Sequence, residues 1–499
     1  MLKSNIAELD DDTRTDLTNL GRQLVRKSDK QPRVTPQRQG HNLADFRKVL
    51  ETAGLPIEGE WKPYFPSRKI SKCYHYFRSA IIKLAETEGL SEPEAALRVH
   101  EAALQAVIVK IEVANHADAF VLFESLNNRG VPLSPVDLIK NHLLAESEKR
   151  NVMKVDEAFK HWNDVLASLG DSYSTHERFL RHYYNAFKSE LPDVPNATVA
   201  TKSRLIRIYE TLLERDLERV VDSLVGASKI YGRINCVVEL DQPTSLDLAF
   251  QRLMRAQGAP SYVLIMWLMS KQTGLELSEK HVEKVVDLLT SFFVRRNLTG
   301  YPPTYALAKL FMTTIDAVGD ARGDEVLSVV RERLSSASAS DDEFRSRLVG
   351  RIYQENTDVT RFVLATLAED SMTRETKVDL WRQEKNHFVW TIEHILPQGE
   401  NLPQAWQEML GSPEAAAQAQ EEHRHRLGNL TITAYNSNLG NKSFVEKRDR
   451  QDSKGRFIGY RNGLSLNTEL SSRDSWPADD IERRTSALAD KVIERFPLA

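Results

Sequence analysis

The spacing of apolar residues predicts helices over most of the chain, with strands in two places. Apolar positions recur at helical spacing in residues 42–53, 69–88 and 91–105. The run at 105–113 is rich in β-branched residues and partly alternates between apolar and polar positions, so it predicts a strand. Helical spacing then continues through residues 155–385, interrupted by Pro and Gly. These patterns predict mixed structure near the start of the chain and a helical bundle in its middle.

The sharpest helix start in the first half of the chain is at Ser134. This residue can cap a helix, Pro135 suits the first helical position, and Asp137 can close a capping box. We place domain boundaries on either side of the helical bundle. The expected domains are a partial N-terminal domain at 1–150, a helical connector bundle at 151–384 and a C-terminal domain at 385–499.

The C-terminal region changes from helical to alternating patterns. Residues 390–395 are apolar and β-branched, and Pro397 ends any strand there because it lacks the N–H that pairing needs. Residues 430–433 alternate as a short half-buried strand does, and a turn rich in Asn and Gly leads to a helix at 443–450. The predicted order is strand, loop, strand, helix. The fold class is therefore α+β and mostly α-helical.

Candidate chemistry lies at the ends of these elements. His394 can take a proton from water, because the ordinary pKa of imidazole is near neutrality. Glu393 and Asn438 offer oxygen ligands that suit Mg²⁺ or Mn²⁺, and a bound ion would stabilise charge on a phosphate. Neighbouring strand residues point to opposite faces, so Glu393 and His394 can share a site only at a strand end or bulge. The arrangement suits phosphodiester hydrolysis.

Three motifs in this order carry a resemblance to a known family. They are Glu-His-Ile-x-Pro at 393–397, Gly-Asn-Leu-Thr at 428–431, and the Asn nine residues after Asn429. They resemble an HNH, or ββα-metal, nuclease, and more narrowly the C-terminal nuclease domain of GmrSD-type, modification-dependent type IV restriction endonucleases. The run Asn-Lys-Ser-Phe-x-x-Lys at 441–447 is similar to that family too.

The resemblance implies a role for each matching residue. His394 would be the general base, Glu393 and Asn438 would hold a divalent Mg²⁺ or Mn²⁺ ion, and Asn429 would orient the histidine or the hairpin. Taken singly, such residues are more often ordinary loop and turn residues, since Asn tolerates left-handed geometry. The interpretation depends on the three motifs occurring together.

A second resemblance to the same family lies at residues 123–141, which look like the closing part of its ParB-like N-terminal domain. In that family the domain is associated with nucleotide hydrolysis and with control of the nuclease. The family's Asp-Gly-Gln-Gln-Arg motif is absent from this sequence, so we expect an incomplete ParB-like domain, and hydrolysis of GTP or ATP by this chain is doubtful. A second polypeptide, or another copy of this chain, would complete the domain through residues 33–141.

The candidate ligand or interface residues of that stretch have an equally good structural explanation, because a turn and a helix cap can hold two elements together. These residues are Glu124, Asn127, Arg129 and Gly130.

Charge is distributed unevenly along the chain. The net charge of −4 gives no global argument for nucleic-acid binding, but residues 423–461 contain nine Lys or Arg against three acids. A basic face beside the candidate site is what a phosphate-binding surface requires. His423 and His425 could bind metal or phosphate from one face of a strand, but we favour an exposed, solvated pair. The residues expected to contact DNA are Arg424, Arg426, Lys442, Lys447 and Arg448.

The remaining composition argues against several protein classes. The two cysteines, Cys73 and Cys236, and the absence of any Cys-x-x-Cys argue against a disulfide framework and a structural zinc site. The polar, acidic start of the chain is unlike a signal or transit peptide. The longest apolar run, 262–269, is too short to cross a bilayer. The expected location is cytoplasmic.

These features together predict a metal-dependent HNH endonuclease that hydrolyses DNA and acts in restriction of foreign or phage DNA. The alternative is a catalytically silent DNA-binding or regulatory subunit of a split restriction system, in which the nuclease fold is retained without turnover. Cleavage of plasmid DNA in Mg²⁺ or Mn²⁺ without nucleotide discriminates between the two.

Overall fold

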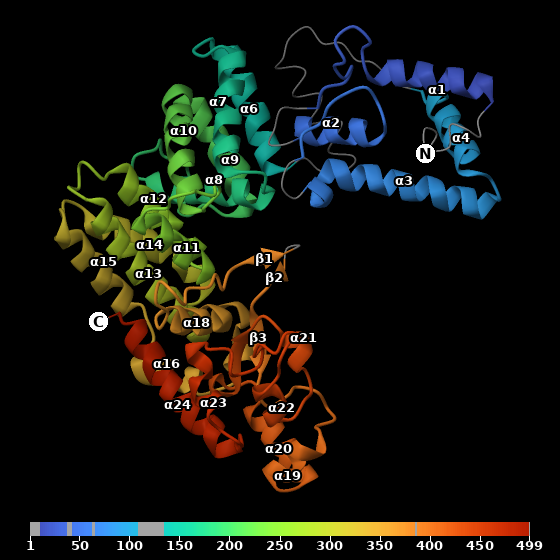
Figure 1. Ribbon diagram of the computed structural model, residues 1–499. Coiled ribbons are helices and arrows are strands. Elements are labelled where there is room, and N and C mark those ends of the chain that lie inside the picture. Colours follow the sequence, from blue (N-terminus) through green and yellow to red (C-terminus); the bar gives the residue numbers. More distant parts are fainter. Residues whose placement is uncertain (1–9, 37–41, 62–64, 108–133, 385–386, 499) are drawn as a thin grey trace. The chain divides into compact units, whose positions relative to one another are not determined.

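The structure, a computed structural model, forms two compact units (Figure 1). The second unit holds Arg181–Leu191, Thr198–Ala200 and Ile230–Ala499, and the first holds the rest of the chain. The border between them runs through the helices α8 (Tyr173–Phe187) and α10 (Leu217–Ile234). The residues that the structure describes are 10–36, 42–61, 65–107, 134–384 and 387–498.

The first unit consists of helices whose starts are fixed by local sequence. Ser91 caps α4 and forms a capping box with Glu94, and Ser134 caps α6 with Pro135 in the first turn. The helices predicted from periodicity in this part of the chain are confirmed to within a residue or two. The helices are α1 (Asp11–Leu24), α2 (Asn42–Thr52), α3 (Lys69–Glu88), α4 (Glu92–Leu104), α6 (Pro135–Arg150), α7 (Val155–Leu169) and α9 (Leu205–Arg215).

The predicted strand at 105–113 lies almost entirely outside the described residues, as do Glu124, Asn127, Arg129 and Gly130. Within the described part of the first unit, strand-like pairing is limited to an isolated bridge between Val25 and Pro32. The ParB-like sheet therefore stays a prediction.

The second unit begins with a helical bundle, as predicted. Its helix α12 (Tyr262–Ser270) is apolar on all sides, and Tyr262 to Leu268 are all buried, as expected for a helix at the centre of a core. Among the described residues, no helix has both the length and the apolar character needed to cross a bilayer. The other helices are α11 (Ser245–Arg255), α13 (Glu279–Thr299), α14 (Thr304–Val318), α15 (Asp324–Ser336), α16 (Asp341–Leu348), α17 (Ile352–Glu355) and α18 (Thr357–Glu369).

The two predicted strands and the helix that follows them are confirmed in the C-terminal region, but the segment predicted as a loop between the strands contains two helices, at 404–410 and 413–423. β3 (Thr391–His394) pairs antiparallel with β4 (Leu430–Thr433), which places His394 opposite Leu430. α22 (Phe444–Arg448) follows and is capped by Ser443. The remaining elements are β1 (Gln383–Glu384), β2 (His387–Phe388), α19 (Gln404–Leu410), α20 (Pro413–His423), η5 (Leu427–Asn429), α21 (Asn436–Leu439), η6 (Ser465–Asn467), α23 (Thr468–Ser471) and α24 (Ala478–Arg495).

An apolar cluster joins the end of β3 to the surrounding helices. Ile395 and Leu396, directly after the strand, are buried together with Trp406, Phe444 and Trp476. The rings of Phe444 and Trp476 stack with their centroids 5.8 Å apart and their planes 9° apart. Because such stacked aromatic pairs bury large apolar surfaces, this cluster fixes the end of β3 relative to α22.

Helix α24 holds the other strand through close backbone contact. Arg484 is buried and donates hydrogen bonds to the carbonyls of Gly428 and Leu430. The N–H of Gly428 donates to the hydroxyl of Thr485 at 3.0 Å. A Cβ atom on Gly428 would lie 2.1 Å from the carbonyl oxygen of Ile481. Any larger residue at position 428 would therefore push β4 away from α24.

We expect Gly428→Ala to destabilise the second unit by about 3 kcal/mol or more, because overpacking here meets backbone atoms. Gly226→Ala is the control: Gly226 lies inside α10, and a Cβ there has no neighbour within 4 Å. That substitution should be neutral or stabilising by about 0.5–1 kcal/mol. Guanidinium denaturation followed by tryptophan fluorescence measures both. Equal stability of the two variants would contradict the close packing of Gly428 on α24.

Candidate active site

His394 and Glu393 end β3 and point in different directions. Only 5% of His394 and 2% of Glu393 are exposed. Because consecutive strand residues point to opposite faces, Glu393 contacts α22, whereas His394 contacts Gln398 and His425. The two predicted functional groups are neighbours in sequence but have separate surroundings.

Three side chains surround the ring of His394. The amide nitrogen of Gln398 lies within 2.8 Å of both ring nitrogens, and Nδ1 of His425 lies 3.3 Å from Nε2 of His394. Tyr353 of α17 contacts the ring edge to face, with centroids 4.7 Å apart. Gln398 is exposed, so it covers the His394 ring on the side nearest to solvent.

Burial is the main cause that lowers the pKa of His394 to about 3, and the nearby His425, Lys447 and Arg424 add to it. The ring is therefore neutral at pH 7 and can accept a proton. A base with so low a pKa is weak, since general bases work best near the working pH. A phosphate beside the ring would oppose the shift, because a negative charge favours the protonated form.

Asn429 links the two chain segments that carry His394 and His425. Its Oδ1 accepts from the N–H of Leu396 at 2.7 Å, and its Nδ2 donates to the carbonyls of Leu396 and Arg424, both at 3.0 Å. Asn429 is fully buried, and these bonds all go to the backbone. The side chain thereby fixes the distance between the end of β3 and the turn before His425.

Gln420 of α20 fixes the loop that carries Gln398. Its Nε2 donates to the carbonyls of Pro397 at 2.6 Å and Gly399 at 2.8 Å. Because these carbonyls lie on either side of Gln398, the loop is held close to His394 from outside the β3–β4 pair.

Glu393 and Lys447 form a buried ion pair between β3 and α22. Nζ of Lys447 lies 2.6 Å from Oε1 of Glu393 and also donates to the carbonyls of His394 at 2.7 Å and Ile395 at 3.2 Å. Burial raises the pKa of Glu393 and lowers the pKa of Lys447, and the contact between the two charges opposes both shifts. The ammonium group is thus bound by three oxygen atoms at the end of the strand.

In this arrangement one of the two residues predicted to hold a metal ion, Glu393, is already bound to another side chain. The carboxylate of Glu393 is neutralised by Lys447, and Asn438 is exposed on α21. Its neighbour Asn436 donates to the carbonyl of Ile392 at 2.8 Å. Within the described ranges, no three His, Cys, Asp or Glu side chains gather as metal ligands would.

Comparison with known families matches both ends of the chain. Residues 338–491 match the family described as GmrSD restriction endonucleases, C-terminal domain, and residues 6–144 match the GmrSD restriction endonuclease, N-terminal domain. The chain belongs to the GmrSD restriction endonuclease family. No curated protein matches its sequence.

The C-terminal GmrSD match includes Tyr353, His394, His425 and Lys447, so the surroundings of His394 lie inside the family domain. The N-terminal match begins well before residues 123–141. The family resemblance drawn from the sequence motifs is therefore confirmed, and membership of a family of restriction endonucleases supports a role as a DNA-cleaving nuclease.

Two of the five residues predicted to contact DNA in this GmrSD protein are buried in ion pairs. Lys447 is fully buried against Glu393, and Arg448 pairs with Asp449 and Asp474. In this arrangement neither side chain offers a surface to a phosphate. The expectation is corrected for both positions, because both side chains are buried as well as bound to carboxylates.

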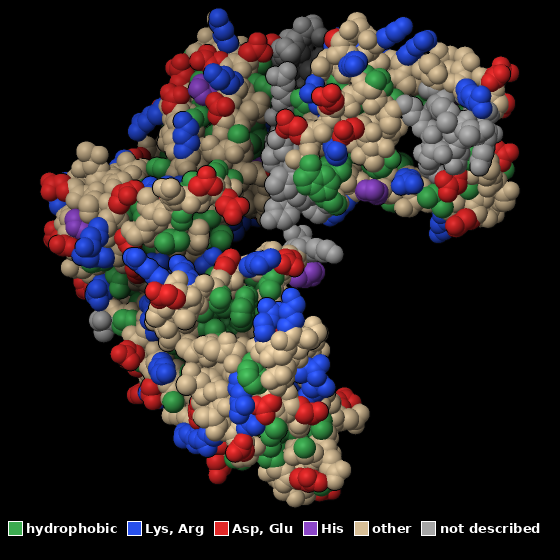
Figure 2. All heavy atoms as spheres, in the orientation of Figure 1, with side chains coloured by type: hydrophobic (Ala, Val, Ile, Leu, Met, Phe, Trp, Pro, Cys, Tyr) green, Lys and Arg blue, Asp and Glu red, His purple; other side chains and the backbone are tan. Residues whose placement is uncertain are grey.

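The other three predicted DNA contacts are at the surface. Arg424 pairs with Glu421 at 3.2 Å and Arg426 with Glu482 at 3.3 Å, and both are partly exposed. Lys442 is also partly exposed. Figure 2 shows Lys and Arg side chains over α21 and α22 interspersed with Asp and Glu, without an unbroken basic patch on this face.

The interpretation of His423 and His425 as an exposed pair is wrong. Helix α20 ends at His423, so the two do not share a strand, and their exposed fractions are 4% and 7%. Gln398, Tyr353 and Gln420 were not predicted from the sequence. The strand register could have indicated His425: once β3 and β4 pair antiparallel, the residues just before β4 must lie beside the end of β3.

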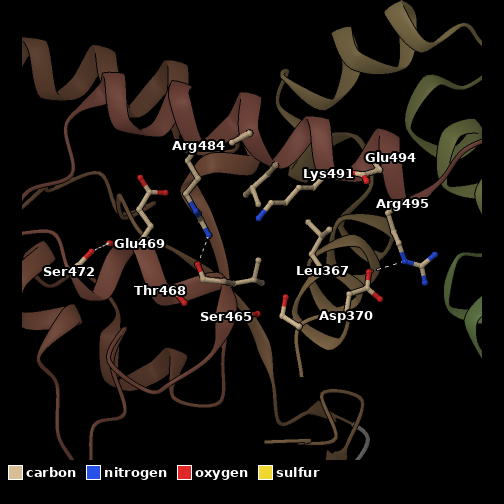
Figure 3. A pocket seen from close by; sticks show the side chains of 14 residues that line it. Leu367, Asp370, Ser465, Thr468, Glu469, Ser472, Arg484, Lys491, Glu494 and Arg495 are labelled. Carbon is tan, nitrogen blue, oxygen red and sulfur yellow. Dashed lines mark hydrogen bonds and ion pairs between the residues drawn. The ribbon is translucent and has the colours of Figure 1, made fainter. Parts of the chain in front are cut away.

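A cavity of about 760 Å³ in the GmrSD C-terminal region is separate from these residues. Figure 3 shows it bounded by α24, with Arg484 and Lys491 on one wall and Arg495 paired with Asp370 at 2.8 Å. Its lining carries charges of both signs and includes none of the predicted catalytic or metal-binding residues. We assign it no role in the chemistry of His394.

We expect Glu393→Gln or Lys447→Met alone to lower the free energy of unfolding by about 3–5 kcal/mol, because each leaves the other charge buried without its partner. The double variant should be clearly more stable than the sum of the two losses predicts, since no unpaired charge remains. Glu384→Gln, in a pair whose side chains are 64% and 63% exposed, should change stability little. Additive losses in guanidinium denaturation would count against a direct Glu393–Lys447 interaction.

Proposed function

We propose that this chain is an HNH-type, or ββα-metal, endonuclease that hydrolyses DNA phosphodiester bonds in restriction of foreign or phage DNA. The observation that carries the proposal is the position of His394 at the end of a β3–β4 pair that α22 follows. His394 acts as the general base and removes a proton from the water that attacks phosphorus.

In this proposal, substrate approaches His394 from the side of its ring that contacts the exposed Gln398. Its amide lies between the ring and solvent, so a water or phosphate oxygen that reaches Nδ1 must share or replace that contact. The amide N–H groups can donate to a phosphate oxygen. Arg424, Arg426 and Lys442, which are partly exposed, supply positive charge for the DNA backbone.

A divalent cation, Mg²⁺ or Mn²⁺, belongs to the proposal through the resemblance to HNH nucleases. When bound, such an ion supplies positive charge to the phosphate and the leaving oxygen. Because Glu393 is held by Lys447, we derive no step through the ion from this arrangement. Asn438 is the predicted ligand whose side chain remains at the surface, where its Oδ1 accepts a long hydrogen bond from Ser437 at 3.5 Å.

One observation favours the alternative of a silent, DNA-binding or regulatory subunit. His394 is only 5% exposed and its pKa is lowered to about 3, which makes it a weak base as it stands. A protein that kept the nuclease fold only for assembly could have the same buried imidazole at position 394. Two further points stay predictions. One is that a second polypeptide or a second copy of this chain completes the N-terminal domain through residues 33–141. The other is that hydrolysis of GTP or ATP by this chain is doubtful.

His394→Ala should reduce cleavage of plasmid DNA by roughly 10²-fold or more, the usual loss when a general base is removed. His161→Ala on α7, with 26% of its side chain exposed, is the matched control and should cleave like the parent. Rates are compared at equal metal concentration, with folding checked by circular dichroism. Cleavage by His394→Ala at the parent rate would show that this histidine does not take part in catalysis. An inactive parent chain would favour the alternative of a silent subunit.

Chelation with EDTA should abolish cleavage, and Mg²⁺ or Mn²⁺ should restore it more effectively than Zn²⁺, because the predicted ligands are oxygen atoms. Asn438→Ala should raise the half-saturating Mg²⁺ concentration by about 10-fold, whereas Asn163→Ala, on α7 in the first unit, should not. Cleavage that survives EDTA would refute the metal requirement alone. A raised Mg²⁺ requirement in Glu393→Gln at unchanged stability would show that Glu393 leaves Lys447 to bind the ion.

A further inference from the structure

We infer that His425 is a positioning residue that accepts a hydrogen bond from Nε2–H of His394 and so leaves Nδ1 of His394 free to take a proton. This inference rests on the proposed role of His394 as general base. It assigns a function to a histidine that no matching motif includes.

The contact between the rings of His394 and His425 requires one donor and one acceptor. A neutral imidazole has one donor and one acceptor nitrogen. The amide nitrogen of Gln398 lies 2.5 Å from Nδ1 and 2.8 Å from Nε2 of His394, so this amide does not by itself select the tautomer. Nε2 of His394 lies 3.3 Å from Nδ1 of His425, and if Nε2 donates in this contact, Nδ1 of His394 keeps the lone pair that a general base at that atom requires.

His425 is itself held by contacts on three sides. Its ring stacks on Tyr353 with centroids 5.4 Å apart and planes only 6° apart. Its carbonyl accepts from the N–H of Tyr353 at 3.3 Å, and the preceding carbonyl, of Arg424, accepts from Asn429. Because both ring and backbone are held, Nδ1 of His425 faces Nε2 of His394 in a constant direction.

In this arrangement the orientation of a general base is set by a further side chain that is hydrogen-bonded to it. Without an acceptor at Nε2, the ring of His394 would populate both tautomers, and in one of them Nδ1 would carry a proton and could not act as a base. Loss of such an orienting partner lowers the catalytic rate while leaving substrate binding largely intact. A purely structural His425 would act through its stacking on Tyr353 instead.

Two substitutions in the full-length chain separate these roles. His425→Asn places an amide oxygen near the position of Nδ1 but removes the stacking ring, whereas His425→Phe keeps a ring for Tyr353 but removes the acceptor. We expect His425→Phe to lower kcat for plasmid cleavage by about 10–100-fold with KM within about 2-fold, the size of effect seen for outer partners of a reactive group. His425→Asn should keep kcat within about 3-fold of the parent, since its oxygen can accept the same bond.

A second measurement does not depend on activity. The ¹⁵N spectrum of histidine-labelled protein at pH 7 should show unprotonated Nδ1 and protonated Nε2 for His394, assigned by its absence in His394→Ala. In His425→Phe the two nitrogens should shift toward a mixture of tautomers. A His394 that is protonated on Nδ1 in the parent protein would overturn the inference whatever the cleavage rates are.

The outcomes also separate this inference from the proposed function. If His394→Ala is inactive but His425→Phe cleaves like the parent, His425 has no positioning role and the proposed function stands. If His425→Asn is inactive and His425→Phe is active, stacking rather than hydrogen bonding is what His425 supplies. If His394→Ala cleaves like the parent, the proposed function fails, and the ¹⁵N spectrum still decides whether the hydrogen bond exists.

Discussion

One buried ammonium group fixes the geometry on which the candidate site depends. Lys447 binds Glu393 and the carbonyls of His394 and Ile395, so it joins the end of β3 to α22. A helix as short as α22 is not stable by itself, and it is ordered here by its cap at Ser443 and by this ion pair. The carboxylate beside the proposed general base therefore has a structural role that its place in the motif does not reveal.

The rest of the site is organised by side chains that bind backbone. Asn429 and Gln420 hold the loops on either side of His394, and Arg484 holds the start of β4. Backbone groups in irregular segments need partners when they are buried, and these polar side chains supply them. The position of the His394 imidazole therefore depends mainly on side chains that do not contact it.

Most of the fold could be predicted from local sequence. Caps such as Ser91 and Ser134 and the helical spacing of apolar residues define the helices, and alternation with Pro397 defines the strand pair, because these depend on neighbours in the chain. The position of His394 at a strand end was predicted in the same way.

The surroundings of the site could not be predicted because they depend on contacts between distant segments. Lys447 meets Glu393 across 54 residues of chain, and His425 meets His394 across 31. A count of Lys and Arg treats Lys447 and Arg448 as surface charges, although both are bound to carboxylates. Local patterns cannot distinguish a paired charge from a free one.

The position of Tyr353 limits how the candidate site can be transferred between proteins by recombination. The ring that stacks on His425 belongs to α17, which is separated from β3 by α18 and the β1–β2 pair. Recombination that exchanged only the strand–strand–helix segment among relatives would separate His425 from this ring. The smallest inheritable unit of the site therefore extends upstream into the helical region and is larger than its motif.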